Sequence, residues 1–414
     1  MAFAPTAAYQ GLVISDNAKA SVAAWNVAVN GRLSYPEVSE EEARDGYGRY
    51  PDVFPGVYAV AIPAYWVARP LVIDPSEPHG GFPEVPIWPA TATNVVVCTA
   101  GMLVLIELLR RLVSPGLALA GGLAFGLATP FWSVAANALW PHGPDILWLG
   151  LALAAVARRR WAVAGAFFGV AVFTRPTLAV VPAVVGLWIG VSERSWRPVV
   201  GVGIPAALGL GALSLYTQVL YETWWPIAGY DPARVGGALG TGDPYTHGYS
   251  MIQQLWGTLF DRLRGVLVFT PVLLPMVVAA LKGWRSAPPW SRAAAVAGLL
   301  YWAVQLRSNP FPGGFNFWGY RYPLEPLFLA LPLAMVGYAT WIAGRAWWRR
   351  TTQVLAVASL AMIVPGAIWY SVKPEPIRDE YRTEYRDGRI GTGVTNAWKS
   401  PSVTVRKQGE VASL

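Results

Sequence analysis

The chain has 414 residues, of which 54% are hydrophobic and only 14% are charged. Soluble domains carry about 25% charged residues, so this composition excludes a water-soluble domain, which would have to expose large apolar patches. The formal net charge is +8. We do not take it as a sign of a nucleic-acid partner, because the arginines stand at the ends of apolar stretches, where they set membrane orientation. The single cysteine, Cys98, excludes an intrachain disulfide.

Residues 1–92 are predicted to form an extracytoplasmic segment whose helices lie in the outer membrane interface. Within it, residues 16–30 read as a short helix with Ser15 or Asp16 as the N-cap. Residues 53–73 are apolar, but three prolines interrupt them and argue against a clean span. No signal peptide precedes this translocated segment. We therefore expect one more transmembrane helix upstream of the sequence or, alternatively, a short span over the first 14 residues.

Ten apolar segments between residues 93 and 370 are predicted to cross the bilayer. They are 93–112, 117–136, 143–158, 161–174, 176–192, 198–217, 265–282, 292–306, 322–343 and 352–370. Several are shorter than the roughly 20 residues that a perpendicular span needs, above all 143–158 and 161–174. The sequence thus predicts an all-α polytopic membrane protein with about ten transmembrane helices.

The positive-inside rule gives these spans an orientation. One set of loops holds 13 cations, which are Arg110, Arg111, Arg158, Arg159, Arg160, Arg194, Arg197, Lys282, Arg285, Arg292, Arg345, Arg349 and Arg350. The alternate loops hold 6, which are Arg175, Arg234, Arg262, Arg264, Arg307 and Arg321. The first set is therefore predicted to be cytoplasmic. The N-terminal segment and the tail 371–414, which has turn signals for a hairpin but could also be disordered, then face outward in a plasma membrane.

Candidate functional residues lie at the outward helix ends. Asp16 has two readings, an N-cap or a general base that takes a proton from an acceptor hydroxyl. Arg175, Arg264 and Arg321 could converge on a lipid phosphate, which a guanidinium fork suits. The alternative is that each arginine only snorkels to headgroups.

Two further groups of outward residues are candidates for an acceptor or sugar site. His142 belongs to the turn 140–145, which could equally be a capped turn between helices. Trp224 and Trp225 could stack on a sugar face, although membrane-belt aromatics look the same in sequence. Glu222, beside them, is a second carboxylate candidate. The histidines and the cysteine show no metal-ligand spacing, and we expect no metal and no cofactor.

Six motifs spread over nearly the whole chain resemble those of the GT-C superfamily of membrane glycosyltransferases. The similarity is to the branch of protein mannosyltransferases and aminoarabinose transferases, and more closely to a poorly characterised bacterial and archaeal group. The motifs are Ser15-Asp16-Asn17-Ala18 with 30–33; Gly48-Arg49-Tyr50 with Phe54-Pro55-Gly56; 139–144; Thr174-Arg175-Pro176-Thr177; 264–271; and Gly313-Gly314 with Gly319-Tyr320-Arg321-Tyr322. Their shared order, and their placement at outer helix ends, carry the resemblance.

The resemblance implies a reaction at the outer face of the membrane, in which a sugar passes from a polyprenyl-phosphate donor to an acceptor. It implies that Asp16 is the base and that Arg264 and Arg321, with Arg175, hold the donor phosphate. Two departures are visible. Asn17 stands where relatives often carry a second acid, and the lysine that relatives often carry after the tyrosine of the second motif is missing, with Arg49 as its candidate substitute.

We therefore expect a GT-C-like glycosyltransferase whose partners are a polyprenyl-phosphate-linked sugar and membrane lipids. The acceptor stays unknown, and no nucleotide sugar is needed outside the cell. Two alternatives remain. A transporter or lipid flippase would place ionisable groups near the membrane midplane, and a non-catalytic membrane scaffold would fit the reduced acidic motif.

Overall fold

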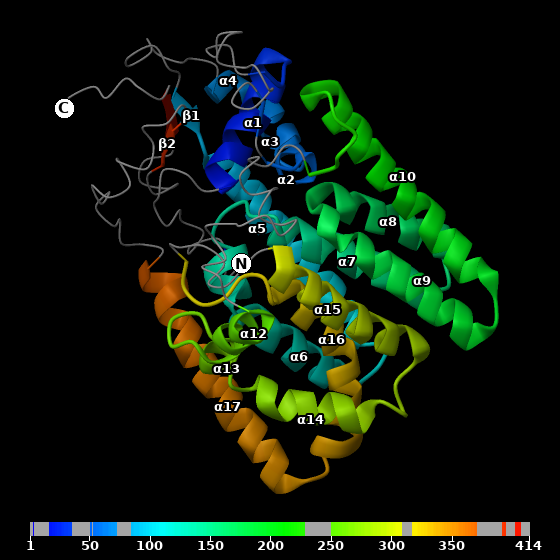
Figure 1. Ribbon diagram of the computed structural model, residues 1–414. Helices are drawn as coiled ribbons and strands as arrows, with labels where there is room; N and C mark the ends of the chain where they lie inside the picture. Colours follow the sequence, from blue (N-terminus) through cyan, green and yellow to red (C-terminus); the bar gives the residue numbers. More distant parts are fainter. Residues whose placement is uncertain are drawn as a thin grey trace.

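The computed structural model describes residues 3, 16–34, 50–51, 53–72, 84–227, 250–308, 317–370, 391–394 and 402–406. Four helices of the N-terminal segment lie together at one end of the molecule, which are α1 (Asp16–Asn30), α2 (Pro55–Ala59), α3 (Ile62–Val67) and α4 (Arg69–Val72) (Figure 1). The predicted helix 16–30 is confirmed. The prolines divide the second predicted stretch into three helices, because each stands in one of the first two positions of a helix, where its missing N–H costs nothing.

The remaining helices form one bundle (Figure 1). They are α5 (Trp88–Leu109), α6 (Pro115–Leu127), η1 (Phe131–Ala135), α7 (His142–Ala157), α8 (Trp161–Thr174), η2 (Pro176–Ala179), α9 (Val180–Glu193), α10 (Trp196–Tyr221), α12 (Met251–Phe260), α13 (Val266–Phe269), α14 (Leu273–Gly283), α15 (Pro289–Ser308), α16 (Leu324–Gly337), η3 (Tyr338–Ile342), α17 (Ala346–Val364) and η4 (Pro365–Tyr370). Each of the ten predicted spans coincides with a helical segment of this bundle.

Within the described residues, five helices are long and apolar enough to cross a membrane, and they cover 88–109, 176–193, 197–221, 324–342 and 346–368. Four further apolar helices are shorter, among them α7 and α8, the two whose length fell short in the sequence. The 16 residues of α7 span about 24 Å, against a hydrocarbon core of about 30 Å. The predicted helical membrane class is confirmed, and the bundle mixes full-length and short helices.

Boundaries differ from the predicted spans where polar residues or prolines act. The first span begins at Trp88 rather than at residue 93, and Pro89 stands in its first turn, where the missing N–H costs nothing. Thr93 Oγ1 donates to the carbonyl of Pro89 at 2.8 Å, which satisfies it inside an apolar helix. The predicted span 265–282 is divided between α13 and α14 at Pro271, which has no N–H to donate.

Close helix packing depends on small residues in α8 and α10. A Cβ atom added to Gly209 of α10 would lie 2.5 Å from the Cα of Gly169 in α8. Backbones can approach this closely only where both residues lack a side chain, which is how membrane helices gain packing contact without a hydrophobic driving force. Substituting either glycine by alanine would force the two helices apart.

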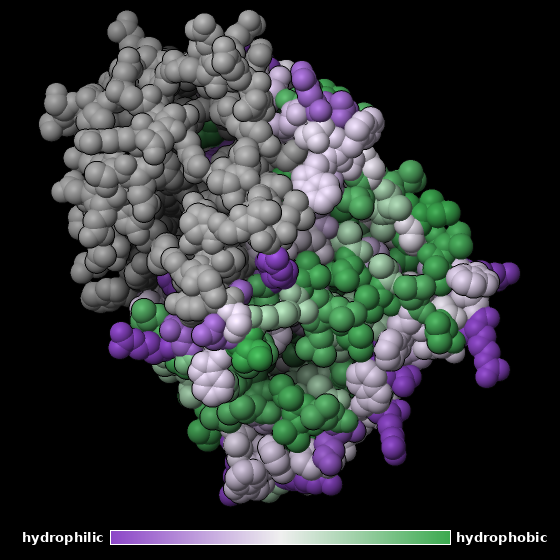
Figure 2. All heavy atoms as spheres, in the orientation of Figure 1, coloured by the Kyte–Doolittle hydropathy of each residue, from purple (hydrophilic) through white to green (hydrophobic). Residues whose placement is uncertain are grey.

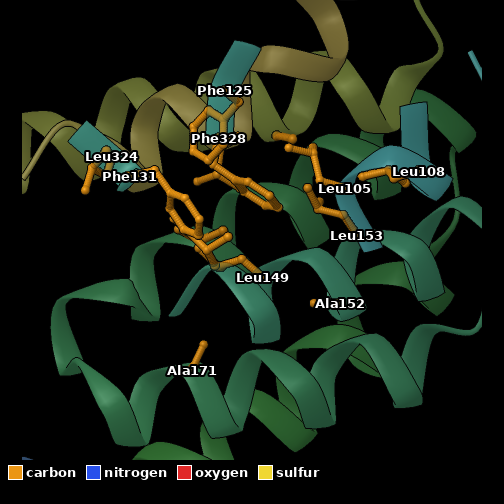
Figure 3. Packing of buried hydrophobic residues seen from close by; sticks show 14 of the residues in the cluster. Leu105, Leu108, Phe125, Phe131, Leu149, Ala152, Leu153, Ala171, Leu324 and Phe328 are labelled. Atoms are coloured by element: carbon orange, nitrogen blue, oxygen red, sulfur yellow. The ribbon is translucent and has the colours of Figure 1, made fainter. Parts of the chain in front are cut away.

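Buried aromatic and aliphatic side chains fill the centre of the bundle (Figure 3). Phe125 of α6 lies between Phe131 and Phe328, with ring centroids 5.5 and 5.8 Å away. A second apolar cluster joins α1, α2 and α3 to Leu139 and the partly buried Trp140. The N-terminal helices therefore pack onto the segment just before α7.

A broad hydrophobic face covers the visible side of the bundle, and hydrophilic side chains gather beyond its rim (Figure 2). Helices α9 and α10 carry strongly exposed apolar side chains such as Val191, Ile204 and Leu208. Of the most apolar stretch of α10, only 17% is buried inside the bundle, against 61% for the corresponding stretch of α16 and its continuation η3. In a membrane, α10 therefore faces lipid and α16 lies at the centre, so the chain is a multi-pass helical membrane protein.

Three short strands occur outside the helices. Strand β3 (Ser402–Arg406) pairs antiparallel with both β1 (Glu84–Pro86) and β2 (Gly391–Val394). The hairpin alternative for the tail is confirmed, since β2 and β3 pair in the order that one hairpin gives. Its attachment to β1 joins the tail to the N-terminal segment, a contact that the sequence did not predict.

Candidate functional site

Two of the predicted site residues fall partly or wholly outside the described residues. Arg49 lies outside them. Asp16 is the first residue of α1, and its side chain is also outside the description. The placement of α1 is nevertheless informative, because its apolar side packs in the same cluster as Leu139 and Trp140. Asp16 therefore begins a helix that is attached to the segment preceding α7.

Arg264 and Arg321 both lie near one aromatic ring. The guanidinium carbon of Arg264 is 4.1 Å from the ring centroid of Phe317, and that of Arg321 is 5.4 Å from the same centroid. Both arginines are half-buried. The structure thus brings together two of the three outward arginines that the sequence proposed for one site, although 57 positions separate them along the chain.

A carboxylate holds the backbone that presents Arg264. Asp261 follows α12, and its Oδ1 accepts from the backbone N–H groups of Leu263 and Arg264, both at 2.8 Å. This turn leaves the Arg264 side chain directed at the segment before α16, where it donates to the carbonyls of Phe317 and Gly319. The contact fixes the Arg264 motif to the Arg321 motif.

A buried hydrogen bond makes a second join between these two motifs. The hydroxyls of Thr270 and Tyr320 are 2.9 Å apart. Tyr320 is only 2% exposed, and burial raises the pKa of its hydroxyl, so the group stays neutral near physiological pH. Gly319, just before it, has φ +102° and packs against Pro130, a conformation that favours glycine.

Arg321 is surrounded by aromatic rings. Its Nη2 donates to the hydroxyl of Tyr322 at 2.7 Å, and its guanidinium carbon lies 4.7 Å from the centroid of that ring and 5.2 Å from that of Trp140. Trp140 belongs to the cluster that holds α1. The end of the bundle that carries Arg321 is therefore the end on which α1 packs.

Four ionisable side chains form a buried network directly behind Arg321. His142 Nδ1 is 2.6 Å from Glu325 Oε1. Arg175 reaches both carboxylates of the network, with Nε 3.7 Å from Asp145 Oδ2 and Nη1 3.8 Å from Glu325 Oε1. His142, Asp145 and Glu325 have no exposed surface, and Arg175 is 8% exposed. Such burial is tolerated only because opposite charges are paired.

Polar groups of α15 and η2 complete the network. Arg175 Nη1 donates to the Tyr301 hydroxyl at 3.3 Å, and the Gln305 amide donates to the same hydroxyl. Gln305 also donates to Thr177 Oγ1 at 2.9 Å. The network therefore connects α7, the α8–η2 junction, α15 and α16 at one end of the bundle.

The sequence interpretation did not include Glu325, Tyr301 and Tyr322 among the site residues. For Glu325, the sequence did contain a signal. Glu325 stands inside the predicted span 322–343, and a carboxylate inside a span is by default a functional candidate with a partner. Asp145 gives the same signal, because its carboxylate stands inside the predicted span 143–158. His142 was predicted in a turn, whereas it is fully buried and bonded to Glu325.

The motif that contains Phe54-Pro55-Gly56 packs against the motif that contains Arg175. A Cβ atom added to Gly56 would lie 2.5 Å from the backbone nitrogen of Thr174, so a glycine is required at this contact. The N-terminal segment thus reaches the residue next to Arg175, which brings a third motif to the same end of the molecule.

Glu222, Trp224 and Trp225 lie past the end of α10, and all three are exposed. Tyr221, just before them, donates from its hydroxyl to the carbonyl of Pro51 at 2.8 Å. The described hydrogen bonds, ion pairs and ring contacts do not link these three side chains to the pair Arg264 and Arg321. The residues that the structure describes also contain no group of three His, Cys, Asp or Glu side chains arranged to hold a metal ion.

No protein-family model and no curated protein matches the sequence. Among solved structures, the chain is similar to ArnT from Cupriavidus metallidurans, an aminoarabinose transferase of the GT-C superfamily. The apo structure matches over 89% of this chain and 74% of its own, with a TM-score of 0.45 and 16% identity. The structure bound to undecaprenyl phosphate matches over 88% and 69%, with a TM-score of 0.44 and 18% identity. The similarity is distant.

Proposed function

We propose that the chain is a GT-C-like membrane glycosyltransferase that moves a sugar from a polyprenyl-phosphate donor to an acceptor on the outer face of the membrane. The observation that supports this most is the position of Arg264 and Arg321 near the same ring, that of Phe317. Exposed apolar side chains, among them Phe260 and Leu263, stand just before Arg264 in the chain. A lipid phosphate would meet both a cationic site and a hydrocarbon surface there.

The two guanidinium groups fit the chemistry of such a donor. Each can donate paired, charge-assisted hydrogen bonds to phosphate oxygens. When the bond between the anomeric carbon and the phosphate breaks, the polyprenyl phosphate departs with both electrons of that bond. Arginines at fixed positions stabilise the charge that develops on its oxygens.

Asp16 supplies the other half of the proposed reaction. Its carboxylate takes the proton of the acceptor hydroxyl while the hydroxyl oxygen attacks the anomeric carbon. A single in-line displacement of this kind inverts the configuration at that carbon. The attachment of α1 to the cluster around Trp140 supports this role, because Arg321 lies over the same tryptophan.

The exposed residues beyond α10 are candidates for the acceptor side. Trp224 and Trp225 are 64% and 45% exposed, so their rings are open to a sugar face. Glu222 adds a carboxylate beside them. Their neighbour Tyr221 reaches the N-terminal segment at Pro51, which makes an acceptor site between these two segments part of the proposal.

A transporter or flippase is the second candidate, and the buried network is the observation in its favour. Intramembrane ionisable residues often mark ion or substrate pathways. However, His142 and Asp145 stand in the first turn of α7, and Glu325 stands in the first turn of α16. Transporter sites lie near the membrane midplane, so a network at helix ends fits a surface site better.

Lipid-phosphate binding tests the proposal. Titration of the purified protein with undecaprenyl phosphate should show that Arg264→Ala and Arg321→Ala each weaken binding by about 10-fold or more, as expected when a hydrogen bond to a charged group is lost.

Lys282→Ala and Arg345→Ala are the matched controls. Their cationic groups lie 5.6 and 4.4 Å from one ring centroid, that of Trp341, at the other end of the bundle. Equal losses in all four variants would reduce the effect to general attraction of an anionic lipid. Vesicle assays in which polyprenyl phosphate changes leaflet, without any sugar transfer, would support the flippase instead.

A further inference from the structure

Tyr322 connects the proposed phosphate site to the buried network. On one side, its hydroxyl accepts a hydrogen bond from Arg321 Nη2 at 2.7 Å, and the Arg321 guanidinium carbon lies 4.7 Å from the ring centroid. On the other side, the Arg175 guanidinium carbon is 5.7 Å from the same centroid and the His142 ring meets it edge-on at 6.3 Å. One phenol ring is therefore in contact with the outer arginine and with two residues of the network.

The network residues behind Tyr322 are themselves fixed. Glu325 accepts from or donates to His142 across 2.6 Å and is 3.8 Å from Arg175. Glu325 and His142 have no exposed surface, and Arg175 is 8% exposed. Tyr322 also stands in the turn that leads into α16, which the backbone hydrogen bond from Leu324 N–H to the Arg321 carbonyl closes at 3.1 Å, and Glu325 follows it in the first turn of that helix. The ring of Tyr322 is thus held both through its own backbone and through its neighbours.

Arg175 is poorly placed to bind a lipid phosphate directly. It is 8% exposed, and two carboxylates and the Tyr301 hydroxyl already surround its guanidinium group. A phosphate would have to approach a cation whose charge two carboxylates offset. Arg175 can instead affect the site indirectly, through its contact with the Tyr322 ring.

We propose that Tyr322 is a positioning residue, which transmits the fixed geometry of His142, Arg175 and Glu325 to Arg321 and so sets the direction of the Arg321 guanidinium group. This inference rests on the proposed function, because it assumes that Arg321 binds the donor phosphate. It assigns Arg175 to the support of the site rather than to the phosphate itself. A bidentate guanidinium contact needs a fixed orientation, which a long arginine side chain does not have unless another group holds it.

The test is a double-mutant cycle on binding of undecaprenyl phosphate. Tyr322→Phe keeps the ring and removes only the hydroxyl that Arg321 contacts. We expect it to weaken binding about 3- to 10-fold, the range for loss of one hydrogen bond. In the Arg321→Ala background the same substitution should have no further effect, because the residue it positions is absent.

Tyr216→Phe is the matched control. It removes a tyrosine hydroxyl of α10, which lies 3.1 Å from the hydroxyl of Tyr58 and takes no part in the proposed phosphate site. It should leave undecaprenyl phosphate binding unchanged, even if it lowers the unfolding temperature. A purely structural role of Tyr322 would predict the same loss of binding in both tyrosine variants.

The outcomes separate this inference from the proposed function. If Arg321→Ala binds undecaprenyl phosphate as the wild type does, the proposed function fails. If Arg321→Ala weakens binding but Tyr322→Phe does not, the proposed function stands and the positioning role is wrong. A loss in Tyr322→Phe that persists at full size in the Arg321→Ala background would also overturn the positioning role, since the two residues would then act independently.

Discussion

The two ends of the helical bundle both place two cations near one aromatic ring, but their surroundings differ. At one end, Arg264 and Arg321 lie near the ring of Phe317, and a buried network of four ionisable groups adjoins them. At the other end, Lys282 and Arg345 lie near the ring of Trp341. The ion pairs near this second end are exposed, as at the end of α5, where Glu107 and Arg110 are 3.3 Å apart with about half of each side chain in solvent.

This difference separates two uses of charge in one membrane protein. Exposed loop cations cost little to maintain, and they set orientation through their number. Buried ion pairs often give no net stability compared with apolar residues of similar size. The buried network is therefore better explained by what it holds in place, which is the segment that carries Tyr322 and Arg321.

The largest expected effect concerns the orientation of the two ends in the membrane, because labelling of an introduced cysteine either occurs or does not. In a Cys98→Ala background, a cysteine introduced at Gly237 or Asn396 should react with a membrane-impermeant thiol reagent in intact cells. A cysteine at Arg159, which is 69% exposed in the loop after α7, should not react. Labelling at position 159 alone would reverse the orientation and place the proposed site inside the cell.

Stability should distinguish the two kinds of ion pair next. Arg175→Met leaves two buried carboxylates without their cation and should destabilise the protein by about 3–5 kcal/mol. Glu107→Gln removes the acid of an exposed pair and should change stability by less than about 1 kcal/mol. Reversible unfolding in mixed micelles measures both values. Comparable losses in the two variants would remove the distinction between the ends.

Asp16 should affect the reaction far more than the fold. Asn is about as good an N-cap as Asp, so Asp16→Asn should barely change thermal stability. A carboxamide cannot act as a base, and we expect sugar transfer to fall by at least about 100-fold, equivalent to about 2.7 kcal/mol of barrier.

Asp16→Ala adds the structural comparison. It should lose the same activity and, in addition, about 1 kcal/mol of stability. Wild-type transfer by Asp16→Asn would leave Asp16 as a cap only, and the base would then have to be sought at Glu222 or Asp52.

A lysine at position 321 should give a smaller loss. Lys keeps the positive charge, but an ammonium group cannot make the paired contact of a guanidinium fork or accept the same stacking on Tyr322 and Trp140. Arg321→Lys should weaken binding of undecaprenyl phosphate by about 10-fold, with membrane insertion unchanged. Lys282→Arg at the opposite end should leave binding at the wild-type value. Full affinity in Arg321→Lys would mean that charge alone matters there.

Periodicity and composition predicted much of the fold. Each long apolar run with arginines at its ends lies on a helical segment of the bundle, and the capping and proline signals placed α1 and the break between α2, α3 and α4. The predicted convergence of Arg175, Arg264 and Arg321 followed from topology, since all three stand at helix ends on one predicted side. These properties depend on local sequence patterns or on the side of the membrane to which a loop is assigned, and both can be read from a single sequence.

The remaining contacts depend on packing between distant segments. Glu325 and His142 are 183 positions apart, and Arg175 and Tyr301 are 126 apart. No local pattern indicates which carboxylate meets which cation once helices α7, α15 and α16 pack together. The strand pairing of residues 84–86 with 402–404 is missing from the sequence interpretation for the same reason.

Photo-crosslinking compares the two ends most directly. A photoreactive phenylalanine analogue replaces either Phe317 or Trp341, two aromatic residues that each have two cations near the ring. Labelled undecaprenyl phosphate is then added to the purified protein in vesicles that contain an excess of phosphatidylglycerol. The account predicts strong crosslinking at position 317 that unlabelled undecaprenyl phosphate competes away, and background crosslinking at position 341. Equal crosslinking at both positions, or crosslinking at 341 alone, would contradict a polyprenyl-phosphate site at the Arg321 end.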